Sequence, residues 1–384
     1  MLYCADVAGA FDRVSAERLR QKLRASGIHP KLLKLLFSWL EKRTAYVVVG
    51  GAKSRELSLY DMVYQGTVLG PALWNLFYAD VRRACQKAGY KEVVFADDLH
   101  AYDVADVSIP NEKLLTEAAG CQTEVHTWGD ANGVFFESTK ESFRVLSRSC
   151  PHGEDMNMLG VEFDTGLYMD VEISGLAAEC SWKLASLTRS HRFFSDYHTV
   201  QLYKAHILSY LEYRTAAIYH ASSSRLQSLD SIQRRALRMA GMTEHDALMH
   251  CKLAPLQIRR DLGMLGIIHR CVLGKGPAHF KEIFKRSEEA CTSGRTTRLA
   301  NRRHGLQLQE YRGSQNFIKQ SILGLVTVYN LLPARIVEGC KSVRNFQGAL
   351  QQLVKDRATA GMEDWETTFS PRLDFNGHPL LGVC

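Results

Sequence analysis

The chain has 384 residues, of which 46% are hydrophobic and 23% charged, and its formal net charge is +7. These proportions are typical of soluble globular proteins and exclude a disordered or fibrous chain. No apolar run approaches the ~18 residues of a membrane-spanning helix, so we expect no membrane partner. The first residues also lack the pattern of a signal peptide.

Along the first part of the chain, strand and helix patterns alternate. In order, they predict a strand at Leu2–Val7, a helix from Ser15 to about Ala25, a helix from Pro30, strands at Tyr46–Val49 and Glu56–Tyr60, a helix from Gly70, a tight hairpin of Val93–Phe95 and Leu99–Tyr102, a helix at Glu112–Asn132 and a strand at Phe143–Leu146.

From about residue 176 the patterns become helical throughout. They predict helices at Leu176–Arg192, Thr199–His220, Leu226–Met242, Gln257–Leu273, Ser314–Leu331 and Asn345–Arg357, with linkers at Gly274–Pro277 and Ser287–Arg303. Residues 225–344 hold 21 Lys and Arg against 9 Asp and Glu, while the rest of the chain holds 27 against 32. This asymmetry indicates either a polyanionic partner for the basic part or a solvated helical surface.

The ten cysteines are scattered singly, without a Cys-x-x-Cys pair. This spacing favours neither a zinc site nor a disulfide framework, and it fits a reducing intracellular compartment best.

Three acidic residues carry the strongest chemical signal. Asp6 lies near the end of the first strand, and Asp97 and Asp98 lie together at the tip of the predicted hairpin. If that strand and that hairpin are neighbours in one sheet, Asp6 and Asp97 can meet. Paired carboxylates are what two Mg²⁺ ions need for an in-line phosphoryl displacement. Taken alone, however, each motif also fits a simple turn cap or strand end.

A glycine-containing segment lies between these acids and precedes a predicted helix. It reads Gln65-Gly66-Thr67-Val68-Leu69-Gly70-Pro71. Its glycines permit close approach of a flat ligand to the backbone, and Pro71 fits the first position of a helix. Alone, the segment could also be an ordinary loop that starts a helix.

In this order, Asp6…Phe11-Asp12, Gln65-Gly66…Gly70-Pro71 and Phe95-Ala96-Asp97-Asp98 resemble motifs A, B and C of reverse transcriptases. Thr139-Lys140 is similar to motif D of that family, and Leu159-Gly160-Val161 to the strand that follows. Three later segments resemble the thumb and C-terminal part of jockey-like, non-LTR retrotransposon polymerases: Leu202-Tyr203-Lys204, Ile232–Arg238 and Tyr329–Pro333.

The resemblance implies an α+β fold: a right-hand polymerase palm at 1–170, a helical thumb at 171–245 and a C-terminal helical region at 246–384. It also implies an RNA-directed DNA polymerase, a nucleotidyltransferase that acts on dNTPs with an RNA template and a DNA primer. The cofactors would be two Mg²⁺ ions, with Mn²⁺ as a substitute. The site of action would be the nucleus, the cytoplasm or both.

Residue by residue, the resemblance makes Asp6 and Asp97 metal ligands and Asp98 the third carboxylate of the metal site. Phe11 would be the ring that excludes a 2′-OH, and Lys140 would act on the leaving pyrophosphate. Gln65 and Gly66 would lie near the incoming nucleotide and template. In the helical part, we expect the basic side chains to contact the phosphates of a primer–template duplex. These are Arg234, Arg235 and Arg238.

Asp6 lies close to the start of the sequence, whereas family members carry their fingers, and often an endonuclease, upstream of that position. We therefore expect an N-terminally truncated enzyme with weak or no polymerase activity. The alternative is a remnant or domesticated retroelement protein that binds nucleic acid without catalysis.

Overall fold

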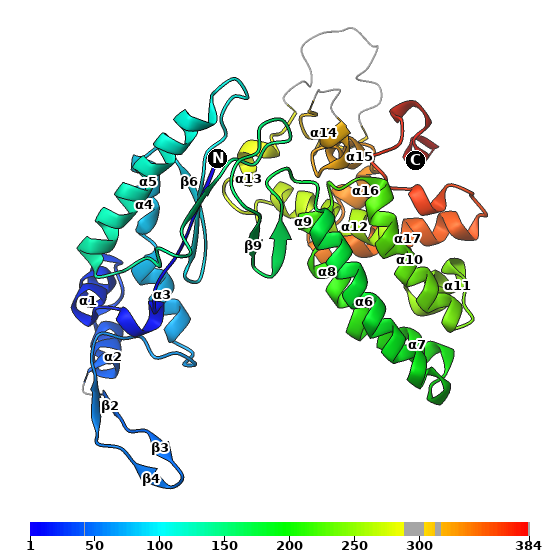
Figure 1. Ribbon diagram of the computed structural model, residues 1–384. Helices are drawn as coiled ribbons and strands as arrows, with labels where there is room; N and C mark the ends of the chain where they lie inside the picture. The colour runs from blue at the N-terminus through cyan, green and yellow to red at the C-terminus, as the bar shows by residue number, and fades with distance from the viewer. Residues whose placement is uncertain (42, 288–302, 312–315, 383–384) are drawn as a thin grey trace. The chain divides into compact units, whose positions relative to one another are not determined.

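The computed structural model describes residues 1–41, 43–287, 303–311 and 316–382, which form two compact units (Figure 1). The first unit comprises residues 1–156 with 165–167. The second comprises residues 157–164 and the chain from 168 onward. Most of the linker expected at Ser287–Arg303 lies outside the described residues. No helix in the described ranges is long and apolar enough to cross a membrane.

The first unit is built on an antiparallel sheet with the strand order β6-β7-β1-β8. Its strands are β1 (Leu2–Asp6), β6 (Lys91–Phe95), β7 (Asp98–Tyr102) and β8 (Ser142–Arg144). The predicted first strand, hairpin and later strand are therefore confirmed, and so is the mixed α and β character of this part of the chain. In this sheet β1 pairs with β7 on one side and with β8 on the other, which lie about 90 and 140 residues downstream in the sequence.

Five helices accompany the sheet: α1 (Ala16–Ala25), α2 (Pro30–Leu40), α3 (Gly70–Tyr78), α4 (Val81–Lys87) and α5 (Asn111–Asn132). The Ser15 side chain accepts a hydrogen bond from the backbone N–H of Arg18, so it caps α1 as expected. Buried side chains of these helices share one hydrophobic core with Ala5 and Leu99 of the sheet. Because neighbouring side chains on a strand point to opposite faces, Asp6 and Asp98 point away from this core.

The segment between α2 and α3 differs from its prediction. Instead of two strands at 46–49 and 56–60, β2 (Arg43–Ala45) pairs with β5 (Leu57–Leu59), and β3 (Val48–Val49) pairs with β4 (Ala52–Lys53). Gly50 and Gly51 both have positive φ angles, 58° and 84°, which only a glycine-rich turn accommodates without strain. The turn and its flanking strands project from the unit as a narrow arm (Figure 1).

The second unit is helical apart from a hairpin of β9 (Met156–Met158) and β10 (Val161–Phe163) at its start. Leu159 and Gly160 form the turn of this hairpin, not the strand that we expected, and both have positive φ. The longer helices are α6 (Asp170–Ser190), α7 (Asp196–Tyr203), α10 (Ser223–Met239), α11 (Glu244–Cys251), α12 (Leu256–Val272) and α17 (Val343–Thr359).

Two predicted helices of this unit are interrupted. The helix expected at Thr199–His220 begins as α7 and continues through a π-helical turn (Lys204–Leu208) into α8 (Ser209–Tyr213) and α9 (Thr215–Ile218). The helix expected at Ser314–Leu331 appears as α14 (Asn316–Gln320) and α15 (Leu325–Asn330), with residues 314 and 315 outside the described part. The short remaining helices are α13 (Phe280–Ile283) and α16 (Ala334–Val337).

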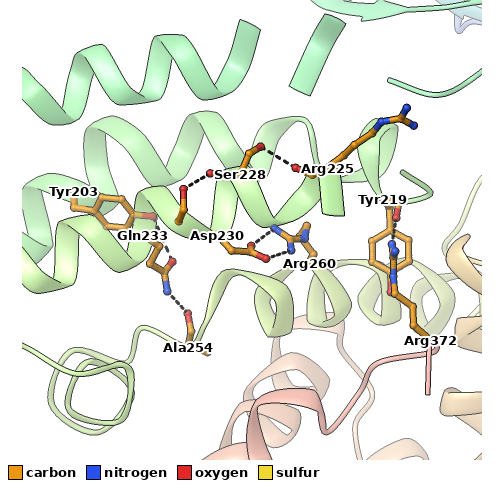
Figure 2. A network of polar contacts seen from close by, with 10 residues as sticks. Tyr203, Tyr219, Arg225, Ser228, Asp230, Gln233, Ala254, Arg260 and Arg372 are labelled. Carbon is orange, nitrogen blue, oxygen red and sulfur yellow. Dashed lines mark hydrogen bonds and ion pairs between the residues drawn. The ribbon is translucent and has the colours of Figure 1, made fainter. Parts of the chain in front are cut away.

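A polar network joins the helices of the second unit (Figure 2). The guanidinium of Arg260 on α12 forms two parallel hydrogen bonds to the carboxylate of Asp230 on α10, at 2.7 and 3.0 Å. Nearby, the Gln233 side chain accepts from the Tyr203 hydroxyl and donates to the Ala254 carbonyl. These buried polar groups satisfy one another, so they fix the helices in one arrangement.

Candidate active site

Two aspartates face each other across adjacent strands in the first unit. In the antiparallel ladder of β1 and β7, Asp6 is the direct partner of Asp98. Residues opposed in this way have Cα atoms about 4.5–5.5 Å apart and side chains on the same face. The two carboxyl groups, 92 positions apart in the sequence, therefore lie side by side at the end of the strands.

Asp97 belongs to the turn that joins β6 to β7, together with Ala96. We expected Asp97 to be the partner of Asp6, but a two-residue turn makes Asp98 the first residue of β7, and Asp98 takes that register position. Ala96 has a φ of +54°, which is strained for a residue with a side chain. The turn keeps Asp97 next to Asp98 at the tip of the hairpin.

The charges of these acids oppose one another. Burial raises the pKa of Asp98 above its ordinary value, and the nearby carboxylates of Asp6 and Asp97 raise it further. His100 and Lys140 act in the opposite direction without cancelling the rise. The folded chain thus holds like charges together at a half-buried position, where a cation would relieve the repulsion.

Lys140 supplies one positive charge at this place. Its ammonium Nζ lies 2.5 Å from Oδ2 of Asp6, although 61% of the lysine side chain is exposed. The segment before Lys140 runs along the end of β1, since Val7 pairs with Phe136 and the N–H of Glu137 donates to the Asp6 carbonyl. The hydrogen bond to Asp6 and its negative charge raise the pKa of Lys140, so the lysine stays protonated.

Phe11 belongs to a short 3-10 helix, Ala10–Arg13, and packs against α3, the helix that follows the glycine-containing segment. Its ring stacks on Trp74 with the ring centroids 5.8 Å apart. Its carbonyl accepts a 2.8 Å hydrogen bond from the N–H of Val63. A Cβ added at Gly70 would lie 2.8 Å from the Tyr64 carbonyl oxygen and 3.5 Å from the Phe11 ring. Only glycine permits this close packing of the loop on the start of the helix.

Gln65 and Gly66 are exposed in the loop that precedes α3. Gly66 has a φ of +81°, and the following Thr67 side chain accepts a 3.1 Å hydrogen bond from the N–H of Gly70, the first residue of α3. The Thr67 hydroxyl itself donates to the Tyr64 carbonyl at 2.6 Å. The loop is thus held at both ends, and it presents the Gln65 amide to solvent.

A family model described as Reverse transcriptase (RNA-dependent DNA polymerase) matches residues 1–163, the segment that contains every residue of this site. These residues belong to the reverse transcriptase family. The family expected from the ordered motifs is therefore confirmed.

Among curated relatives of this chain, the RNA-directed DNA polymerase from mobile element jockey of Drosophila melanogaster is 26% identical over 258 residues, which cover 61% of the chain and 27% of the relative. The jockey polymerase of Drosophila funebris matches to the same extent. The Pol polyprotein from type-1 retrotransposable element R2 of Popillia japonica is 28% identical over 159 residues, 38% of the chain and 26% of the relative. The chain is thus related to non-LTR retrotransposon polymerases, and it spans about a quarter of their length.

The carboxylates of this site fit a divalent cation by their chemistry. Mg²⁺ prefers oxygen ligands and is commonly held by one or two carboxylates, with substrate phosphates and water completing the shell. Asp6 and Asp98 offer such a pair, with Asp97 beside them. Within the described ranges, no group of three or more His, Cys, Asp or Glu side chains converges closely enough to hold a metal ion.

The three arginines predicted to bind nucleic acid lie on α10 in the second unit. Arg234 and Arg238 are exposed and line an open groove of about 480 Å³, together with Thr243 and Glu244. Burial raises the pKa of Glu244, and the Arg234 charge acts against that rise. Arg235 is turned elsewhere, because its Nη2 donates a 2.7 Å hydrogen bond to the Ser181 hydroxyl.

Sequence reasoning missed two aromatic residues of α3 that lie next to the site. Trp74 donates a 2.7 Å hydrogen bond from its indole N–H to the Ala96 carbonyl, and Tyr78 stacks on Trp74 with centroids 4.9 Å apart. Their spacing of four residues shows a shared helix face, but such a pair is more often simple core. Nothing in the sequence indicates that one indole reaches the turn between β6 and β7.

Proposed function

We propose that this chain carries the palm and thumb of an RNA-directed DNA polymerase, which adds dNTPs to a primer 3′-OH on an RNA template. The observation that carries the proposal is the pairing of Asp6 with Asp98 across β1 and β7, with Asp97 on the adjoining turn. The palm would be residues 1–170, the thumb 171–245 and a C-terminal helical region 246–384. The proposed site of action is intracellular, in the nucleus or cytoplasm.

Asp6, Asp97 and Asp98 would hold two Mg²⁺ ions, or Mn²⁺ in their place. Bound ions of this kind stabilise the attacking and leaving oxygens of an in-line displacement. The three aspartates supply the negative charge that keeps the cations at the end of the sheet. Burial and like charge raise the pKa of Asp98, which favours cation binding by making the unbound pair unfavourable.

Phe11 would discriminate between sugars. Its ring cannot swing away freely, because Trp74 lies against it and the Gly70 backbone is close to its edge. A fixed aromatic ring at this place would crowd a ribose 2′-OH and admit a deoxyribose. Gln65 and Gly66, in the exposed loop before α3, would contact the incoming nucleotide and the template.

Lys140 would act on the departing pyrophosphate. While it is paired with Asp6 its pKa is raised, so it serves as a fixed positive charge and not as a proton donor. When a bound cation takes over the Asp6 carboxylate, the ammonium becomes free to approach the phosphates. Its exposed position allows that movement.

The groove of α10 would track the phosphates of the primer–template duplex through Arg234 and Arg238. Two exposed guanidinium groups four residues apart lie on one helix face, which suits contacts to successive phosphates without base reading. Arg235 would take a smaller part, since it is already bonded to Ser181.

Primer extension on an RNA template, with Mg²⁺ and dNTPs, tests the proposal. Asp98→Asn should lower the extension rate by about 10³-fold, because removing one metal-binding carboxylate loses roughly 4 kcal/mol of transition-state stabilisation. The matched control is Asp106→Asn, an exposed turn aspartate that accepts hydrogen bonds from Ser108. It should extend like the unmodified chain.

Two outcomes would contradict polymerase function. If Asp98→Asn extends a primer as fast as the control, the carboxylate pair has no catalytic role. If the chain binds primer–template duplex but neither extends it nor binds Mn²⁺, the alternative of a nucleic-acid-binding remnant is favoured.

A further inference from the structure

Trp74 contacts two other motif segments of the site, Phe11 and the turn before Asp97. It is 1% exposed and lies on α3, the helix that follows the Gln65-Gly66 loop. One face of its indole stacks with Phe11, and its N–H reaches the Ala96 carbonyl in the turn before Asp97. Phe11, α3 and the turn belong to segments that are far apart in the sequence.

The hydrogen bond to Ala96 is specific to an indole at this position. A buried indole N–H needs an acceptor, and the 2.7 Å distance to the Ala96 oxygen provides one. Ala96, whose carbonyl accepts this bond, has a positive φ, a backbone conformation that an alanine does not adopt readily. The bond therefore stabilises the strained residue that immediately precedes the two aspartates.

Two further aromatic rings lie in sequence beside the indole. Tyr78 stacks on Trp74 with centroids 4.9 Å apart and an interplanar angle of 18°, and Trp128 meets Tyr78 edge-on at 5.4 Å. Tyr78 is buried, and its hydroxyl has no hydrogen-bond partner among the described residues. Burial raises the pKa of this phenol, and nearby acidic groups that include Asp97, Asp6 and Asp98 raise it further.

We infer that Trp74 is a positioning residue that sets the turn carrying Asp97 and Asp98 and the ring of Phe11 relative to one another. The inference rests on the proposed function, and it adds that metal binding and sugar selection both depend on the position of Trp74. A change at Trp74 disturbs both, whereas a change at Phe11 disturbs the ring contact and leaves the turn in place.

Hydrogen exchange of backbone amides in the whole chain tests this support without requiring activity. In Trp74→Phe, the Ala96 carbonyl loses its indole donor, so amides of residues 95–98 should exchange about three- to ten-fold faster, the change expected for one lost hydrogen bond. The amides of Asp12 and Val63, which bond around Phe11, should also exchange faster.

Two further variants separate positioning from general loosening of the core. Trp128→Phe removes an equivalent indole bond, to the Asp80 carboxylate at 3.1 Å, and should leave exchange at 95–98 unchanged. Phe11→Leu should speed exchange at Val63 but not at 95–98. If folded Trp74→Phe exchanges at residues 95–98 like the unmodified chain, or no faster than Trp128→Phe, the inference is overturned.

Mn²⁺ binding by the same variants gives a second reading. Trp74→Phe should bind Mn²⁺ about three- to ten-fold more weakly than the unmodified chain, and Trp128→Phe should bind it equally well. Equal affinity in Trp74→Phe would contradict the link to the metal site. If the unmodified chain fails to bind Mn²⁺ at all, the proposed function fails, while the exchange data still decide whether Trp74 holds the turn.

Discussion

Acidic side chains have different neighbours in the two units. In the second unit Asp230 is matched by a two-pronged bond from Arg260, and Asp261 accepts a 2.5 Å hydrogen bond from the Tyr219 hydroxyl. Burial raises the pKa of Asp261 to about 7, while Tyr219, Arg260 and Arg372 oppose that rise. In the first unit, burial raises the pKa of Asp98, the Asp6 and Asp97 carboxylates raise it further, and His100 and Lys140 oppose that rise.

Asp230 is bonded to a cation of its own chain, whereas burial and the nearby Asp6 and Asp97 carboxylates raise the pKa of Asp98. Under the proposed function, a cation from outside the chain would relieve the repulsion at Asp98.

The largest effect that would sharpen this contrast is on stability. Arg260→Ala leaves Asp230 without its partner in a buried place and should lower the free energy of unfolding of the second unit by about 3–5 kcal/mol. Denaturant unfolding followed by circular dichroism measures it. Arg259→Ala is the control, because its ion pair with Glu212 is more exposed and should cost about 1 kcal/mol or less.

If the Arg260 variant loses no more stability than the Arg259 variant, the bonded acids of the second unit are not structural, and the comparison between the units breaks down.

A smaller effect concerns the two exposed arginines of the α10 groove in the second unit. The double variant Arg234→Ala/Arg238→Ala should reduce the slope of log affinity against log salt for a primer–template duplex by about 1.8, the value for two phosphate contacts on B-form DNA. Arg235→Ala is the matched control on the same helix and should change the slope little, since that side chain bonds to Ser181. A slope that the double variant leaves unchanged would show that the groove does not face nucleic acid.

Much of the first unit could be predicted from its sequence, because its signals are local. The short apolar runs Val93–Phe95 and Leu99–Tyr102 predicted the hairpin, and the order of the acidic motifs singled out Asp6, Asp97 and Asp98 as candidates. The register did not follow, since it depends on which residues the turn consumes, and it makes Asp98 the partner of Asp6. The turn at Gly50-Gly51 was predicted, but the division of its flanking strands into the pairs β2–β5 and β3–β4 was not.

Side-chain contacts between residues far apart in the chain could not be predicted from the sequence. The bond from Trp74 to Ala96 crosses 22 residues, and Arg372 reaches the Tyr219 carbonyl across 153. Nothing local at either residue indicates its partner. The π-helical turn at Lys204–Leu208 was also missed, because an apolar spacing typical of helix does not reveal a locally wider turn.

The most direct test of the central claim is the binding of Mn²⁺ to the chain, followed by electron paramagnetic resonance. If Asp6 and Asp98 together form a cation site, the unmodified chain and Asp106→Asn bind Mn²⁺ with equal affinity, while Asp6→Asn and Asp98→Asn each bind at least about ten-fold more weakly, a loss of roughly 1.4 kcal/mol. Undiminished affinity in Asp98→Asn would contradict the account, because the facing carboxylates would then have no part in holding a metal ion.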